Sequence, residues 1–314
     1  MHILLYLSGM LVVVLLGSAL VLRLVRLFGD WSQRRIMQLL VLITPLVSLI
    51  FLMGGLQHAL NQDCSLDAPA WDVVLDFITL LLVGGNMIGA LGLGLGRLAL
   101  MKRVMRQQEA IPDPDLQALV DHLAQKRDLP RLCLQLVPSD RPLALLYGIR
   151  RPIMLLSTWM VDHLDQQELE AVLMHELVHA HRRDYLLNWI GLLLRDAFFY
   201  LPTSRIAYRQ LHYEKELASD DLVAQSTKRP LALASALTKV WLSLVDDASS
   251  PLVQSLGERR ESIADRVERL LDMQNPTAGK PLVGFSSLGV GTSICIVLMN
   301  VVASLAFTIA LLNC

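Results

Sequence analysis

The sequence has few charged residues and lacks the patterns that mark several common classes of protein. Only 18% of its 314 residues are charged, the net charge is −1, and no run of Lys and Arg is long enough to form a phosphate-binding patch. The four cysteines include no CxxC pair, which argues against a cysteine-based zinc site. We therefore expect no nucleic-acid partner. The composition leans instead toward hydrophobic residues, which make up 54% of the chain against about 45–50% in an average globular domain.

The hydrophobic residues are concentrated in four blocks, each about as long as a helix that crosses a bilayer. We expect spans at about residues 3–22, 36–57 and 77–96, and a fourth within residues 281–314. The first block lacks the basic start of a signal peptide and is followed by arginines, so we interpret it as a retained span. The sequence therefore predicts a multi-pass protein with the lipid bilayer as a partner.

Positive charges follow the first and third blocks, but residues 57–72, between the second and third blocks, contain no Lys or Arg. Positively charged flanks stay on the cytoplasmic side of a membrane. We therefore expect a protein of the plasma (inner) membrane with both termini outside. Three spans occupy residues 1–98, a cytoplasmic polar domain occupies residues 99–280, and the fourth span and an extracytoplasmic C-terminus occupy residues 281–314.

The polar domain is predicted to be rich in helices, with a small β-sheet near its start. Asp113 followed by Pro114 is typical of the first residues of a helix. Three short apolar runs, at residues 132–137, 143–147 and 153–156, are typical of strands. A further helix is expected after Asp165, which forms a capping box with Glu168. The predicted fold class is thus a mainly α membrane protein with four transmembrane helices and one polar domain.

Residues 175–179 read His-Glu-Leu-Val-His and lie on the helix that begins after Asp165. His175 and His179 are four residues apart, so they share one helix face with their Cβ atoms about 5–6 Å apart. Two imidazoles at this spacing can bind one zinc ion, and Glu176 can take a proton from the attacking water. The alternative is a solvated helix face with two ordinary histidines. The motif predicts one Zn²⁺ per chain.

A catalytic zinc ion needs a third protein ligand, and a later helix offers candidates. Glu216 and Asp220 are four residues apart, so the glutamate can bind the metal while the aspartate accepts a hydrogen bond from a ligand histidine. His212 shares their face and is an alternative ligand. The developing oxyanion of the reaction also needs a donor. The candidates for that donor are Tyr208, Arg209 and His212, and the sequence does not choose among them.

At these residues the chain resembles the membrane signal-transducer zinc metallopeptidases typified by the bacterial β-lactam sensors of penicillinase and methicillin-resistance regulation. The resemblance rests on LYGIRRPIMLLS (146–157), HELVHAHRRDYLLN (175–188) and EKELASDD (214–221), and on the order of three spans, a domain and one span. It implies a gluzincin-type peptidase domain in the cytoplasm.

Carried over to this sequence, the resemblance implies that His175, His179 and Glu216 bind zinc, that Glu176 is the general base and that Asp220 supports a ligand. It also implies that a substrate backbone adds as an extra strand to one edge of the sheet. The residues of that edge strand are Ala144, Leu145, Leu146 and Tyr147.

The resemblance further implies an endopeptidase that cleaves a cytoplasmic or membrane protein in regulated proteolysis. The substrate would be a transcriptional repressor or the chain itself. The extracellular sensor domain of such relatives follows their fourth span, and we do not expect it here because the sequence stops at Cys314. The alternatives are a membrane-protein quality-control protease of the heat-shock or prenyl-protease type and a non-catalytic membrane scaffold. No feature of the sequence predicts an oligomeric state.

Overall fold

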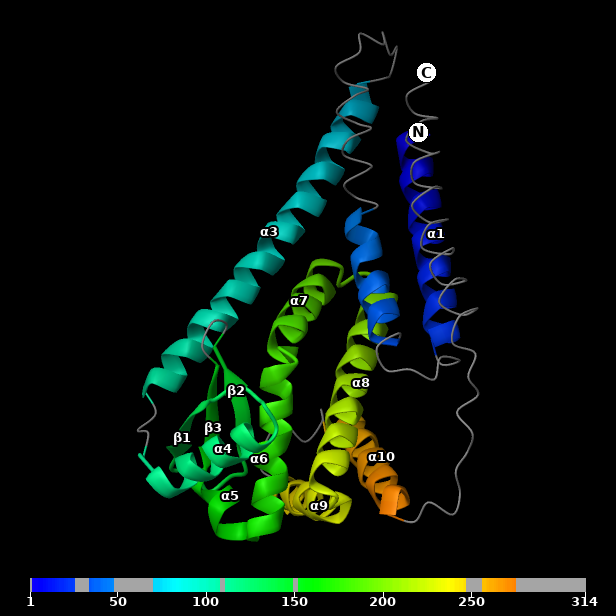
Figure 1. Ribbon diagram of the computed structural model, residues 1–314. Helices are drawn as coiled ribbons and strands as arrows, with labels where there is room; N and C mark the ends of the chain where they lie inside the picture. The colour runs from blue at the N-terminus through cyan, green and yellow to red at the C-terminus, as the bar shows by residue number, and fades with distance from the viewer. Residues whose placement is uncertain are drawn as a thin grey trace. The chain divides into compact units, whose positions relative to one another are not determined.

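The computed structural model describes residues 2–25, 34–47, 70–107, 111–148, 152–246 and 256–274. Figure 1 labels the described helices and strands along the chain, which divides into two compact units. The first unit comprises Met1–Gly96, Trp189–Glu214 and Leu282–Cys314, and the second comprises Arg97–Asn188 and Lys215–Pro281. Residues 189–214, which the sequence analysis assigned to the polar domain, therefore belong to the same unit as the N-terminal helices.

The first unit is built from helices that share one buried apolar cluster. It contains α1 (His2–Val25), helical residues 34–47 and most of α3 (Ala70–Gln107), together with the end of α7 (Asp184–Ala197) and the start of α8 (Pro202–Thr227). Its buried cluster consists of Val21, Leu22, Val25, Met37, Val41, Leu42, Ala90, Leu194, Ala197, Phe198, Leu201, Ala207 and Leu211. The end of α7 and the residues that follow it, through Leu201, are thus buried in this cluster.

Polar contacts join the same helices of the first unit. The side-chain amide of Asn86 on α3 donates to the carbonyl of Ala197 at the end of α7. Arg34 Nη1 donates to Glu214 Oε1 on α8 at 3.1 Å. The two contacts link segments far apart in the sequence, so the apolar cluster is fixed by directional bonds as well as by packing.

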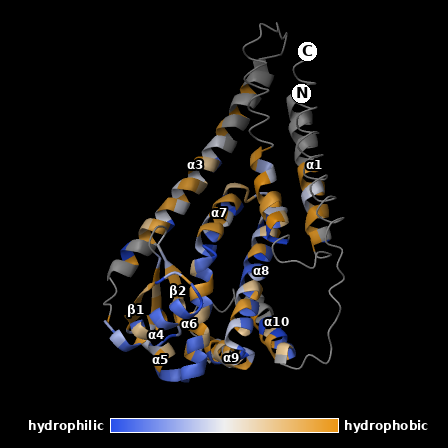
Figure 2. Ribbon diagram, viewed as in Figure 1, coloured by the Kyte–Doolittle hydropathy of each residue, from blue (hydrophilic) through white to orange (hydrophobic). Residues whose placement is uncertain are grey.

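The helices of the first unit also carry exposed apolar side chains. Leu16 on α1 is 67% exposed, and Ile88 on α3 is 74% exposed. Figure 2 shows hydrophobic residues along the described parts of both helices. Within the described residues, no helix combines the length and the apolar character required of a membrane span. The predicted fourth span and residues 48–57 of the predicted second span lie outside the described part of the chain.

Helix α3 is longer than the predicted third span, residues 77–96. It begins at Ala70 and continues through Arg97, Lys102 and Arg103 to Gln107. The charged residues mark the end of the apolar block but not of the helix, because Arg and Lys are themselves good helix formers.

The second unit contains a three-stranded sheet in the order β1-β3-β2. The strands are β1 (Cys133–Val137), β2 (Ala144–Tyr147) and β3 (Ile153–Ser157), which confirms the three strands predicted from the apolar runs. β1 is parallel to β3, and β2 is antiparallel to β3. Within the described residues β2 is therefore an edge strand with one hydrogen-bonded neighbour.

Of the described helices, five belong wholly to the second unit: α4 (Pro114–Lys126), α5 (Thr158–His163), α6 (Gln166–His181), α9 (Pro230–Asp246) and α10 (Leu256–Gln274). α4 begins as predicted, because the Asp113 carboxylate accepts a hydrogen bond from the backbone N–H of Leu116 at 2.9 Å. α6 contacts α4, α9 and β2. Its eight buried apolar residues, from Leu169 to Ala180, lie in the central cluster of this unit.

The start of α6 is fixed by a network of hydrogen bonds. Asp165 accepts from the backbone N–H of Glu168 at 2.9 Å, and the Glu168 carboxylate accepts from the backbone N–H of Asp165 at 2.8 Å, which confirms the predicted capping box. Glu168 also accepts from Ser235 and Lys239 of α9, both at 2.6 Å. These bonds set the start of the helix, so its later turns present fixed faces to the rest of the unit.

Candidate metal centre

The two histidines of the motif lie one turn apart on α6 and turn their rings toward a common point. Both are buried, and their ring centroids are 4.5 Å apart with the planes at 88°. The Nε2 atoms of His175 and His179 are 3.0 Å apart. Two nitrogens bound at 2.0–2.1 Å to one tetrahedral zinc ion would be about 3.3 Å apart. The pair is therefore spaced for a shared ion.

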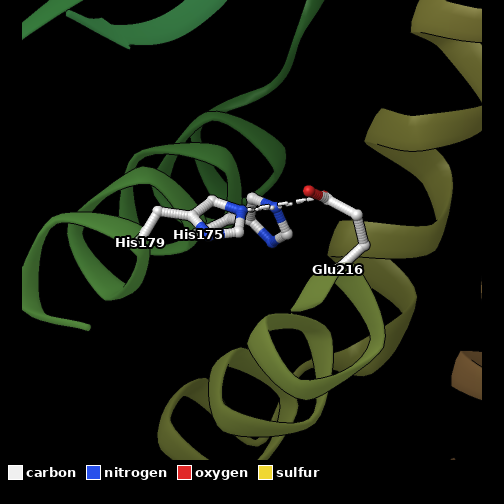
Figure 3. A group of neighbouring side chains, drawn as sticks. All are labelled: His175, His179 and Glu216. Atoms are coloured by element: carbon white, nitrogen blue, oxygen red, sulfur yellow. Dashed lines mark hydrogen bonds and ion pairs between the residues drawn. The ribbon is translucent and has the colours of Figure 1, made fainter. Parts of the chain in front are cut away.

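Glu216 on α8 completes a triangle of possible ligand atoms (Figure 3). Its Oε2 atom lies 3.3 Å from His175 Nε2 and 3.6 Å from His179 Nε2. These three residues form a group whose ligand atoms all lie within 4.8 Å of one another. The three edges of the triangle, 3.0, 3.3 and 3.6 Å, bracket the spacing expected around tetrahedral zinc. Two imidazoles and one carboxylate also match a common ligand set of catalytic zinc.

His175 is supported from behind by an aspartate. Its Nδ1 atom lies 3.2 Å from Asp220 Oδ1, within ion-pair distance but without the alignment of a hydrogen bond. Asp220 is itself held by Arg266 of α10, whose Nε and Nη2 atoms donate to the two carboxylate oxygens at 2.6 and 2.8 Å. Arg266 Nη1 also lies 3.4 Å from Glu216 Oε2. The arginine thus contacts both carboxylates that face the histidines.

His179 is supported by residues close to it in the sequence. Its Nδ1 atom lies 2.8 Å from Asp184 Oδ2, at the start of α7. Arg182 Nε lies 3.5 Å from the same oxygen. Arg183, between these two residues, has a φ of 53°, the left-handed conformation that commonly ends a helix. This turn brings Asp184 back alongside the histidine that precedes it by five positions.

The electrostatics of the cluster favour a cation. Burial lowers the pKa of His175, but its contacts with Asp220 and Glu216 outweigh burial and raise the pKa to about 9. Burial raises the pKa of Glu216, whereas its contacts with the two histidines hold that pKa well below its usual range. The carboxylates therefore stay charged, and the imidazoles lie in a negative field that either a proton or a metal ion would neutralise.

Glu176 is half-buried on α6 and makes no hydrogen bond or ion pair among the described residues. Its charge nevertheless helps to raise the pKa of Arg266, as do the larger contributions of Asp220 and Glu216. The carboxylate therefore acts on the same network as the two other acids. Glu176 directly follows His175 on α6, so its carboxylate lies beside the candidate metal centre, where the sequence predicts a general base.

The three sequence candidates for the oxyanion donor belong to the first unit, whereas the histidines and Glu216 belong to the second. Tyr208 is half-buried, with the Arg195 guanidinium 4.9 Å from the centre of its ring. Arg209 and His212 are exposed. His212 is not in the group of possible ligands, which among the described residues contains His175, His179 and Glu216. The assignment of the donor remains a prediction.

The predicted substrate strand coincides with β2, whose residues Ala144, Leu145, Leu146 and Tyr147 are all half-buried. β2 pairs with β3 on one side, and α6 contacts it. Among the described residues, an edge strand therefore packs against the helix that carries the histidines.

Sequence reasoning missed two residues that hold the cluster in place, Asp184 and Arg266. Asp184 follows the motif by five residues, and its position at the first turn of the next helix was the available signal. The signal for Arg266 was its place in the apolar pattern of α10. It lies three residues after Ile263, on the helix face that also carries Val267 and Leu270. A charged residue in such a pattern is buried only when it is paired.

Comparison with known proteins relates the chain to peptidases. Residues 52–270 match the family described as BlaR1 peptidase M56. The chain is 30% identical over 178 residues to "Protease HtpX homolog 1" of Streptomyces coelicolor, covering 45% of this chain and 57% of that protein. It is 27% identical over 207 residues to "Protease HtpX homolog" of Moorella thermoacetica, covering 65% of each. The matched regions thus span less than two thirds of these two relatives. A third match, "Protease HtpX homolog" of Acaryochloris marina, is 24% identical over 274 residues, or 66% of this chain and 92% of that protein.

Proposed function

Because the chain belongs to the BlaR1-type M56 peptidases, a family of zinc-type membrane peptidases, we propose that it is a zinc-dependent endopeptidase. In this proposal His175, His179 and Glu216 bind the metal and Glu176 is the general base. The observation that carries it is the triangle of ligand atoms from two buried histidines and the half-buried Glu216, with edges of 3.0, 3.3 and 3.6 Å, in a site where the surrounding carboxylates favour a cation.

The residues of the proposed site have separate roles in peptide hydrolysis. When bound, zinc supplies a Lewis acid that polarises the scissile carbonyl and acidifies the attacking water. The Glu176 carboxylate takes one proton from that water as its oxygen forms a bond to the carbonyl carbon. It then returns the proton to the nitrogen of the leaving amine when the C–N bond breaks. Asp220 and Asp184 hold the Nδ1 side of the two imidazoles, which leaves each Nε2 atom for the metal.

The edge strand β2 suggests how a substrate is presented. We propose that an extended segment of the substrate adds to this edge by backbone hydrogen bonds, a recurring mode of peptide recognition. Its position against α6 would align the added strand with the helix that carries Glu176. Backbone pairing is independent of side-chain identity, so β2 would orient the peptide while other contacts select it.

We propose the membrane topology predicted from the sequence, with four spans, the peptidase domain in the cytoplasm and both termini outside. The arginine-rich segments after the first and third apolar blocks support this orientation. Exposed apolar side chains on α1 and α3 support an environment other than water for these helices.

Cys133 on β1 offers a test of this topology, because its side chain is exposed. In a variant that retains Cys133 as its one cysteine, we expect a membrane-impermeant maleimide to react in inside-out vesicles and not in intact cells. Reaction in intact cells would overturn the cytoplasmic location of the domain. A second variant, with one cysteine introduced at the N-terminus, should show the opposite pattern.

For the substrate we propose one specific cytoplasmic or membrane protein, a transcriptional repressor or the chain itself, cleaved in regulated proteolysis. A quality-control protease that degrades damaged membrane proteins is the second candidate, and the similarity to several HtpX homologues favours it. The two differ in substrate range. Broad cleavage of an unrelated unfolded protein by the purified chain would favour quality control, whereas its resistance would favour a specific substrate.

The decisive experiment combines zinc content with the Glu176→Gln substitution. We expect the natural chain to contain one zinc ion and to cleave protein, and the variant to keep its zinc. Cleavage by the variant should fall by about 10²–10⁴-fold, the usual contribution of a general acid–base residue. A chelator-treated sample of the natural chain is the matched control. Absence of zinc from the natural chain, or full activity of the variant, would overturn the proposal and leave a non-catalytic scaffold.

A further inference from the structure

Arg266 is a buried arginine on α10 that contacts two acidic residues of α8 at once. Its side chain is 10% exposed. It donates two hydrogen bonds to Asp220, at 2.6 and 2.8 Å, and its third nitrogen lies 3.4 Å from Glu216 Oε2. A guanidinium is a rigid planar fork that fits a carboxylate with two parallel bonds. The contact therefore fixes the orientation of the Asp220 carboxylate as well as its charge.

We propose that Arg266 is a positioning residue of the metal centre, which holds Asp220 against His175 and Glu216 toward the two histidine Nε2 atoms. The inference rests on the proposed zinc site. Arg266 would act through the two carboxylates and touch neither the metal nor the substrate.

The physical basis is the crowding of negative charge on one face of α8. Glu216 and Asp220 lie one helical turn apart, and like charges at this spacing repel each other. Asp220 is 1% exposed, so water cannot screen its charge. Without the guanidinium, nothing would hold the two carboxylates at this spacing, and one of them would rotate away. This rotation would disturb the oxygen that faces the imidazoles or the contact behind His175.

A neighbouring pair on the same two helices provides a matched control. Arg269 of α10 donates two hydrogen bonds to Asp221 of α8, at 3.1 and 2.9 Å. Both residues line a separate pocket of about 890 Å³, whose lining includes neither histidine of the motif nor Glu216. Loss of Arg269, whose side chain is 39% exposed, therefore removes a second two-bond link between α8 and α10 without removing a contact to the candidate ligands.

The test compares Arg266→Met, Arg266→Lys and Arg269→Met in the full chain purified in detergent. Zinc affinity is measured by competition with a chromophoric chelator, ligand geometry by the visible absorption of the cobalt(II)-loaded protein, and stability by thermal unfolding of the metal-free protein.

For Arg266→Met we expect zinc affinity to fall about 10–100-fold, the usual cost of losing a partner of a metal ligand, and the cobalt spectrum to change. For Arg269→Met we expect lower stability with natural zinc affinity and spectrum. Arg266→Lys keeps the charge without the fork and should recover part of the affinity.

The outcomes separate this inference from the proposed function. If Arg266→Met and Arg269→Met lose stability alike but both bind zinc as the natural chain does, Arg266 serves packing alone and the inference is wrong. If Arg266→Met does not fold, Arg266→Lys decides: weaker zinc binding supports the inference, and natural affinity with an unchanged spectrum overturns it. If the natural chain binds no zinc, the proposed function fails before any variant is compared.

Discussion

The two histidines of the candidate metal centre receive the same kind of support from two different parts of the chain. Behind His179, the aspartate and its arginine lie within five residues, at the turn between α6 and α7. Behind His175, the aspartate comes from α8, and the arginine that holds it lies 46 residues further on, in α10. One half of the site is thus local, and the other half requires three helices to be packed together.

This difference indicates which half of the site is more sensitive to structural change. The local half depends on one turn, so it should form whenever α6 and the start of α7 are helical. The long-range half depends on the positions of α8 and α10. Any change that shifts either helix therefore alters the contacts of His175 and Glu216 together. A conformational change elsewhere in the protein should therefore alter the position of His175 rather than that of His179.

The largest contrast is expected from alanine at the two supporting aspartates. Asp220→Ala leaves Arg266 buried with a single contact to Glu216, and we expect a loss of about 3–5 kcal/mol, the usual cost of breaking a buried ion pair. Asp184→Ala leaves Arg182 half-exposed and Ser219 still 3.3 Å from His179 Nδ1, so we expect a loss of about 1–3 kcal/mol. Thermal or denaturant unfolding of the metal-free full chain measures both. Equal losses would show that the two halves do not differ in the way the contacts suggest.

A smaller effect is expected at Ser219 of α8, which adds a long-range contact to the otherwise local support of His179. Its hydroxyl donates to the backbone carbonyl of Lys215 at 3.1 Å and lies 3.3 Å from both His179 Nδ1 and Arg182 Nη1. Because Asp184 holds the same nitrogen more closely, Ser219→Ala should cost about 0.5–1.5 kcal/mol of stability and leave zinc affinity unchanged. A large drop in zinc affinity measured by chelator competition would show that the hydroxyl, and not the carboxylate, sets the orientation of this imidazole.

The sequence predicted the parts of the site that depend on helical periodicity. His175 and His179 share a face because they are four residues apart, and the same spacing relates Glu216 to Asp220. The capping box at Asp165 and the three strands were also predicted, because turn chemistry and short apolar runs are local signals. The spacing of Glu216 to Asp220 made Glu216 a candidate third ligand beside His212, and the resemblance to known peptidases chose between the two.

The parts that sequence reasoning missed depend on tertiary packing. The apolar pattern around Arg266 indicates a buried, paired charge, but nothing local indicates which of the aspartates in the chain it meets. The grouping of residues 189–214 depends on packing as well. They lie within the predicted polar domain, and their packing with Val21, Met37 and Ala90 groups them with the N-terminal helices.

The short edge strand β2 has a consequence for which targets the protein would cut. Four residues of extended chain span about 13 Å, so a peptide that pairs along β2 must offer a stretch of similar length with its own N–H and C=O groups unused. A helix or a paired strand in a folded target has already satisfied those groups internally. The rate of cleavage would then follow the free energy of local unfolding in the target, and a frayed terminus or a loosened loop would be cut before a rigid segment of the same sequence.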